Sequence, residues 1–214
     1  MKINIINILN TIEKSIVNFR HPLKDFFDNR KKNDLHFLIA ILLSARTRDE
    51  TVLISCTKLF KKIKKIEDIL QMDQKEIEQL IYPVGFYKTK ARYLKLLALV
   101  LKNEFNNKIP DNIEDLLRLP GVGRKTANLF INLAFFKPGI CVDTHVHRIL
   151  NRIGYLNTKS PFETEMFLRK NLNKKYWGKI NSLLVVFGQN ICKPISPRCE
   201  ICKINKCCSY YQTR

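Results

Sequence analysis

The sequence predicts an all-α fold, and three observations support this. Apolar residues recur at steps of three and four along most of the chain, which is the spacing of one face of a helix. No run of alternating apolar and polar residues demands a strand. The helical patterns are separated by short connections, without a low-complexity linker. The 214 residues suffice for one large domain or two small ones.

Five helices are expected in the first half of the chain. An amphipathic helix near the N-terminus carries Ile5, Leu9, Ile12 and Ile16 on one face. The helix after it is apolar throughout and should be buried, and Asp49 is a good N-cap residue for the next one. In order, these later segments read LHFLIAILLSA (35–45), DETVLISCTKLFKKI (49–63), DQKEIEQLI (73–81) and TKARYLKLLALVLKNEF (89–105).

The second half continues the helical pattern. We expect Pro120 to end the first of its helices. Ser160, Pro161 and Glu163 have the types and spacing of a cap, a first helical residue and a capping-box partner. The segments read NIEDLLRL (112–119), TANLFINLAFF (126–136), THVHRILNRIGY (144–155), SPFETEMFLRKNL (160–172) and NSLLVVFGQNI (181–191).

The formal net charge of +19 indicates a polyanionic partner, most simply nucleic acid. The alternative is a lysine-rich composition inherited from a biased genome. No apolar run reaches the roughly 20 residues that a membrane helix needs. Polar residues interrupt the N-terminal apolar pattern, so we expect no export signal and an intracellular protein.

The stretch LPGVGRKTAN, residues 119–128, is predicted to form a tight turn between two helices. Gly121 and Gly123 permit positive φ and close approach of the backbone to a ligand. Successive N–H groups at a helix N-terminus can bind an anion, and Arg124 and Lys125 add positive charge there. A DNA phosphate is the favoured ligand, and a plain helix–helix turn is the alternative.

Five of the seven cysteines lie close to the C-terminus. An odd, clustered set without an export signal favours a metal site over disulfides. One loop with a single CxxC and a distant thiol on each side suits a [4Fe–4S] cluster, with zinc or unliganded thiols as alternatives. The expected ligands are Cys192, Cys199, Cys202 and Cys208, with Cys207 as a competitor for the last position.

Three motifs together resemble endonuclease III, a family of helix-hairpin-helix DNA glycosylases. They are LPGVGRKTAN, VDTHVHRILNRIG and the C-x6-C-x2-C-x5-C pattern that selects Cys208, and they occur in the family's order. The resemblance runs from about Leu35 to Tyr210. It implies two helical domains, residues 27–137 and residues 1–26 with 138–214, with DNA bound in the cleft between them.

The resemblance also implies a reaction and a partner. The family removes oxidised pyrimidines from duplex DNA and cleaves the resulting abasic site. We therefore expect a monomer that binds double-stranded DNA carrying a damaged base or an abasic site, holds a [4Fe–4S] cluster and has no membrane association.

The family's catalytic lysine and aspartate correspond to Lys125 and Asp143. A lysine amine can attack C1′ of a flipped nucleotide and form a Schiff base. Asp143 would stabilise positive charge on the sugar and assist proton transfer. Considered alone, Lys125 is more simply a solvated cation and Asp143 an N-cap, and capping does not exclude catalysis.

Two positions depart from the family pattern. Arg46 stands where bacterial relatives commonly carry Gln, and Phe86 where an aliphatic wedge is usual. Both are expected to fill the gap left by a flipped base, although Phe86 can equally be a core residue. Lys193 and Arg198 make the cysteine loop basic, which favours phosphate contacts.

Two other functions remain open. One is a monofunctional mismatch glycosylase, although that branch typically carries Ser or Tyr at the position of Lys125. The other is a non-catalytic helix-hairpin-helix protein that binds DNA and holds a structural metal.

Overall fold

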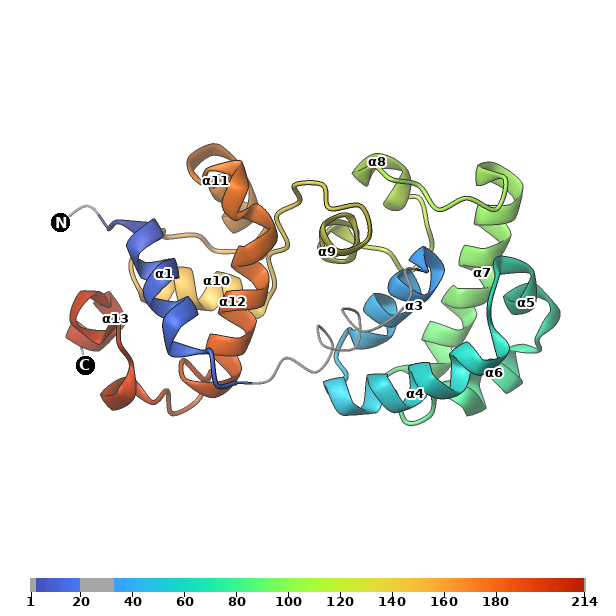
Figure 1. The fold of residues 1–214 in the computed structure, drawn as a ribbon, viewed down its shortest axis with the longest axis horizontal. Coiled ribbons are helices and arrows are strands. Elements are labelled where there is room, and N and C mark those ends of the chain that lie inside the picture. Colours follow the sequence, from blue (N-terminus) through green and yellow to red (C-terminus); the bar gives the residue numbers. More distant parts are fainter. Residues whose placement is uncertain (1–2, 20–32, 214) are drawn as a thin grey trace. The chain divides into compact units, whose positions relative to one another are not determined.

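The structure of the chain is a computed structural model that describes residues 3–19 and 33–213. Within those ranges the regular elements are α-helices and short 3-10 helices, and no residue is in a strand, which confirms the predicted fold class (Figure 1). The chain divides into two compact units, residues 22–137 and residues 1–21 with 138–214. The expected boundary between residues 26 and 27 lies outside the described residues.

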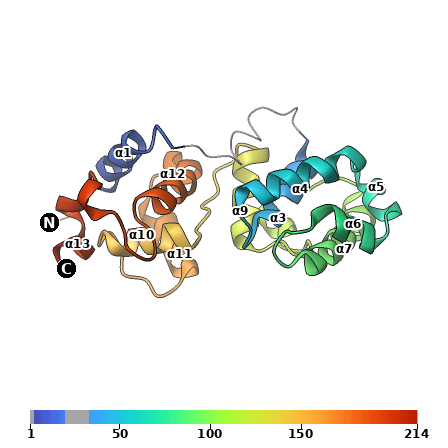
Figure 2. The ribbon, with the colours of Figure 1, turned by 90° about the horizontal axis from the view of Figure 1, so that it is seen from below.

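The unit of residues 22–137 is built around one largely buried helix. Helix α3 buries Leu35 and every residue from Phe37 to Leu43, as its apolar sequence predicts, and it contacts α4, α7 and α9. Helices α5 and α6 both pack on α7, and they lie beside it in both views (Figures 1 and 2). The helices are α3 (Asp34–Ser44), α4 (Asp49–Lys62), α5 (Ile66–Gln71), α6 (Gln74–Ile81), α7 (Tyr87–Phe105), α8 (Ile113–Leu116) and α9 (Arg124–Ala134).

The other unit has its own apolar core. Helix α1 buries Ile5, Leu9 and Ile12, the face that the sequence predicts, and packs on α12. Helix α12 also contacts α10. Helix α12 therefore packs against helices from both chain segments that make up this unit. The elements are α1 (Ile5–Ser15), α10 (Thr144–Arg152), α11 (Pro161–Asn171), η1 (Lys174–Tyr176), α12 (Trp177–Asn190), η2 (Cys199–Ile201), η3 (Asn205–Cys207) and α13 (Ser209–Gln212).

Two local predictions were wrong. Helix α8 ends at Leu116, well before Pro120, and the chain between them continues as turns. Asp49 is the first residue of α4, and the extended Arg48 is the cap position. Helix α5 was not among the predicted helices.

Other helix ends follow the sequence closely. Ser160 accepts a hydrogen bond from the backbone N–H of Glu163 at 3.2 Å, as a capping residue should. Gly154, at φ +80°, follows the end of α10, where a left-handed residue commonly stops a helix. The caps therefore set the start of α11 and the end of α10.

Candidate active site and metal centre

The turn before α9 needs glycine at one of its two glycine positions. Gly121 has φ +81°, and a Cβ there would come within 2.9 Å of the Tyr93 ring. Gly123 has φ −94° and ψ 177°, an extended conformation that any residue adopts, and a Cβ there would meet no atom within 4 Å. Both glycines permit positive φ, but only Gly121 adopts it. Gly123 instead leaves open space beside the backbone.

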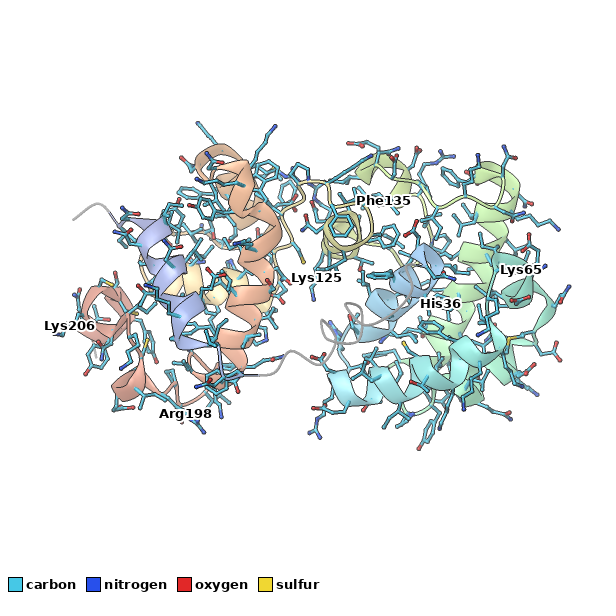
Figure 3. All side chains as sticks on the ribbon, viewed as in Figure 1. His36, Lys65, Lys125, Phe135, Arg198 and Lys206 are labelled. Carbon is cyan, nitrogen blue, oxygen red and sulfur yellow. The ribbon has the colours of Figure 1, made fainter. Side chains whose placement is uncertain are left out.

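Lys125 is an exposed residue in the first turn of α9, directly after the turn. Gly123 is the N-cap and provides no side-chain hydrogen bond, and the first turn holds no acidic residue. The N-terminus of α9 thus presents backbone N–H groups together with the cationic side chains of Arg124 and Lys125. Figure 3 labels Lys125, which lies in the first turn of α9, and Phe135, which is the residue directly after the helix.

Arg46 and Phe86 lie together, although they come from two different loops. Both have left-handed backbones, with φ of 53° and 59°, which is uncommon for residues other than glycine. The guanidinium carbon of Arg46 lies 5.6 Å from the centroid of the Phe86 ring. Phe86 is 62% exposed, so the alternative of core packing is wrong for it.

A buried lysine lies beneath these loops. Lys90 is 6% exposed, and its Nζ donates to the carbonyl oxygens of Leu43 (2.8 Å) and Ala45 (2.6 Å) and to Oγ1 of Thr47 (3.2 Å). Burial lowers the pKa of Lys90 to about 8. The sequence analysis did not single out Lys90, and its place within an amphipathic helix gave no signal of these contacts.

Asp143 lies in the other unit and caps α10. Its Oδ1 accepts hydrogen bonds from the backbone N–H groups of His145 (2.9 Å) and Val146 (3.0 Å). The expected capping role is thus confirmed, and the two bonds fix the orientation of the carboxylate. Lys125 and Asp143 belong to different units.

Four cysteines line one cavity with apolar walls. Cys192, Cys199, Cys202 and Cys208 lie around it, together with Phe187, Ile191 and Ile204 among others. The pKa of Cys202 is raised to about 11, mainly by burial, and the other three thiols contribute to this rise. Cys207 is exposed, does not line the cavity, and its Sγ donates to the carbonyl oxygen of Ile204 at 3.3 Å.

The donor set of this cavity fits an iron–sulfur cluster. Four thiols around one apolar space are the ligands that such clusters use. Within residues 3–19 and 33–213, no three His, Cys, Asp or Glu side chains converge closely enough to hold one metal ion. The fit therefore rests on the shared cavity and on the thiol chemistry.

Two arginines of α10 hold the start of the cysteine loop. Arg148 donates to the carbonyl oxygen of Cys192 at 2.8 Å. Arg152 donates to the carbonyl oxygens of Lys193 (2.7 Å) and Pro194 (2.8 Å) and contacts Sγ of Cys192 at 3.6 Å. The sequence analysis missed both residues, although their spacing of four on one helix places them on the same face.

The loop's own basic residues point to the surface. Arg198 is exposed and Lys193 is half-buried. Arg198 and Lys206 are labelled in Figure 3, where both lie at the edge of their unit. In the part of the chain that the structure describes, no helix is both long and apolar enough to cross a membrane.

Comparison with known proteins identifies the family. Residues 39–174 match the HhH-GPD superfamily of base excision DNA repair proteins. The chain is 41% identical over 196 residues to endonuclease III of Thermotoga maritima, covering 91% of this chain and 92% of that protein.

Solved structures agree with this match. A trapped endonuclease III–DNA covalent intermediate has a TM-score of 0.90 and 32% identity, with 100% of this chain and 98% of that chain covered. A thermostable thymine-DNA glycosylase has a TM-score of 0.77 and 28% identity, with 96% and 98% covered. The chain belongs to the endonuclease III family of the HhH-GPD superfamily, and it is a base excision DNA glycosylase in a family in which abasic-site lyase activity is typical.

Proposed function

We propose that this glycosylase removes oxidised pyrimidines from duplex DNA and cleaves the resulting abasic site by β-elimination, with Lys125 as the nucleophile. The observation that carries the proposal is an exposed lysine in the first turn of α9, directly after a glycine turn. The similarity to a trapped endonuclease III–DNA covalent intermediate supports it, because trapping joins protein and DNA covalently.

The chemistry requires a free amine at Lys125. Once the damaged nucleotide has left the base stack, Nζ attacks C1′, and the bond from C1′ to the base breaks with its electron pair leaving on the base. The attached nitrogen then loses one proton, and the bond between C1′ and O4′ breaks while O4′ takes up a proton, which leaves an iminium at C1′ that keeps one N–H. The iminium acidifies the C2′ hydrogen, and removal of that proton expels the 3′ phosphate. Borohydride reduces the iminium to a stable amine and so traps the adduct.

Asp143 is the second catalytic residue in this proposal. Its carboxylate stabilises positive charge that develops on the sugar, and it assists proton transfer. The two backbone N–H groups that bind Oδ1 hold it in one orientation, so the charge is in place before the substrate reacts. Capping and catalysis are compatible here because a carboxylate has two oxygens.

The turn before α9 is proposed to bind a DNA phosphate. Open space beside Gly123 lets a phosphate oxygen approach the N–H groups at the start of the helix. Gly121 makes the turn possible, and Arg124 adds charge. Such contacts place the DNA without reading its sequence.

Arg46 and Phe86 are proposed to fill the gap in the duplex. Phe86 stacks between bases, and Arg46 donates hydrogen bonds to the base left unpaired. Their mutual contact and the exposure of the Phe86 ring support a shared task.

The cysteine loop is proposed to hold a [4Fe–4S] cluster through Cys192, Cys199, Cys202 and Cys208. When bound, the cluster cross-links four points of the loop through iron–thiolate bonds. Lys193 and Arg198 on this loop then contact DNA phosphates. We further propose that the two compact units are the two domains of an intracellular monomer that binds damaged double-stranded DNA.

Cys207 and Cys208 are neighbours in the sequence, so their serine variants offer a matched test of this ligand set. Cys208→Ser should abolish the broad visible absorbance of the cluster and lower the iron content, whereas Cys207→Ser should keep both. The opposite pattern would assign the fourth ligand to Cys207. Full iron content in both variants would contradict a cluster held by four thiolates.

Borohydride trapping on duplex DNA carrying thymine glycol tests the reaction. A covalent adduct for the wild type, and none for Lys125→Ala, is the expected result. Release of thymine glycol without an adduct would favour a monofunctional enzyme. The similarity to a thymine-DNA glycosylase is the reason to consider this class. Binding without base release would favour a non-catalytic module.

A further inference from the structure

The loops that carry Arg46 and Phe86 are joined by one hydroxyl group. Oγ1 of Thr47 accepts from the backbone N–H of Gly85 at 3.1 Å and from Nζ of Lys90, and it donates to the carbonyl oxygen of Ala45 at 3.2 Å. These three bonds use the one donor and two acceptor positions of a hydroxyl group. The hydroxyl therefore fixes the two backbones to each other next to Arg46 and Phe86.

The backbones also approach closely at this point. A Cβ on Gly85 would lie 2.6 Å from the carbonyl oxygen of Arg46, so only glycine fits there without a shift. Arg46 and Phe86 both hold left-handed backbones, which persist only where the surroundings impose them. Here the surroundings are the neighbouring loop and the lysine beneath it.

Lys90 is the charged centre of this arrangement. Its three acceptors match the three N–H groups of an ammonium, and all of them come from the segment between Leu43 and Thr47. Its own backbone N–H donates to the carbonyl oxygen of Phe86 at 3.0 Å. The side chain of Lys90 therefore contacts the backbone before Arg46 and the Thr47 hydroxyl after it, and the main chain of Lys90 contacts the carbonyl oxygen of Phe86.

We propose that Lys90 is a positioning residue for DNA: through the segment 43–47 it holds Arg46 against Phe86, and so sets how the enzyme engages the gap and the base opposite the lesion. This inference rests on the proposed function, in which Arg46 and Phe86 fill that gap. Because Lys90 is buried under the loops, we do not propose that it contacts the reacting sugar.

The chain offers a matched control on the same helix. Lys95 also donates three hydrogen bonds, to the carbonyl oxygens of Ile69 (3.1 Å), Leu70 (2.7 Å) and Met72 (2.7 Å). These acceptors lie at the end of α5, in a different part of the unit from the loops of Arg46 and Phe86. Lys95→Met thus removes a comparable set of bonds without touching those loops.

The experiment compares Lys90→Met and Lys95→Met with the wild type on two kinds of DNA. The first is a duplex with thymine glycol opposite adenine or guanine. The second is a single strand with an abasic site, which has no opposite base and no gap to fill. Lys90→Met should slow the single-turnover reaction on the duplex about tenfold and change the ratio between the two opposite bases. Its rate on the single strand and its borohydride trapping there should stay within about twofold of the wild type.

Lys95→Met should stay within about twofold of the wild type on both DNAs. Equal losses on duplex and single strand, equal losses in both variants, or no loss in Lys90→Met would each overturn the proposal. Absence of any adduct or base release with the wild type would instead overturn the proposed function. The two failures are therefore distinguishable.

A second pair of variants keeps the test valid if Lys90→Met does not fold. Thr47→Val removes the hydroxyl that joins the loops, and Thr47→Ser keeps it. Thr47→Val should slow the duplex reaction on the order of 3- to 10-fold, whereas Thr47→Ser should keep the wild-type rate. Equal rates for the two Thr47 variants would contradict a positioning role for this network.

Discussion

Lys90 and Lys125 occupy the first turns of two helices in the same unit, yet their surroundings differ completely. Neither α7 nor α9 has an acidic residue in its first turn or a side-chain cap. Lys90 is buried and gives its three N–H groups to three acceptors, while Lys125 is exposed beside a glycine turn. In our proposals the neighbouring groups, and not the residue type or its helix position, distinguish the positioning lysine from the nucleophile.

The largest expected effect is the loss of covalent chemistry in Lys125→Ala. Removing the nucleophile should lower the rate of strand cleavage at a preformed abasic site by more than ~10³-fold, because no Schiff base can form. Lys90→Met should keep cleavage of a single strand close to wild type. A comparison of the two variants in a cleavage assay checks this, and equal losses would remove the distinction between the two lysines.

Asp143→Asn should have the next largest effect. An amide cannot carry the negative charge that stabilises the sugar cation, so base release should slow by about 10²–10⁴-fold. Asparagine caps helices as well as aspartate does, so the melting temperature should change little. Single-turnover kinetics and thermal melting on the same samples measure both. A large loss of stability with normal activity would show that Asp143 only caps α10.

Alanine substitutions at the two glycines before Lys125 should affect different properties, namely stability at Gly121 and DNA binding at Gly123. Gly121→Ala should lower the free energy of unfolding by about 1–3 kcal/mol, because φ +81° is unfavourable for alanine and the added Cβ meets Tyr93. Gly123→Ala should fold normally but bind DNA more weakly, since its Cβ enters the open space proposed for a phosphate. Urea unfolding and DNA titration separate the two. Wild-type DNA affinity in Gly123→Ala would argue against a phosphate there.

The last prediction concerns pH. The folded-state pKa of Lys90 is lowered to about 8 from 10.5, so between those pH values the unfolded chain binds more protons than the folded one. Stability should therefore rise with pH in this window, by at most about 3 kcal/mol, relative to Lys90→Met. Lys95→Met retains Lys90 and should show the same rise as the wild type. Parallel stability curves for the wild type and Lys90→Met would contradict a lowered pKa.

Much of the fold could be predicted from the sequence because helix signals are local. The buried helix 35–45, the apolar face of α1 and the cap at Ser160 all follow from neighbouring residues, and the structure has them. Four cysteines line one cavity, as their place in a single loop suggested, but the choice of Cys208 over Cys207 came from the resemblance to the family. The roles of Lys125, Asp143 and the DNA-contacting residues remain predictions.

The features that were missed depend on partners far away in the sequence. Lys90 binds a segment more than forty residues before it, and Arg152 binds Lys193 and Pro194 about as far after it. Helical periodicity does not encode such pairs. The conformation of Gly123 could not be predicted for a different reason: a glycine permits positive φ without requiring it, and the chain there is extended.

The most direct test of the central claim is to locate the covalent bond. Wild-type protein trapped by borohydride on duplex DNA with thymine glycol is digested with protease and nuclease, and mass spectrometry identifies the lysine that carries the sugar remnant. The account predicts Lys125 as the modified residue. A remnant on Lys90 or on any other lysine, with Lys125 unmodified, would contradict it.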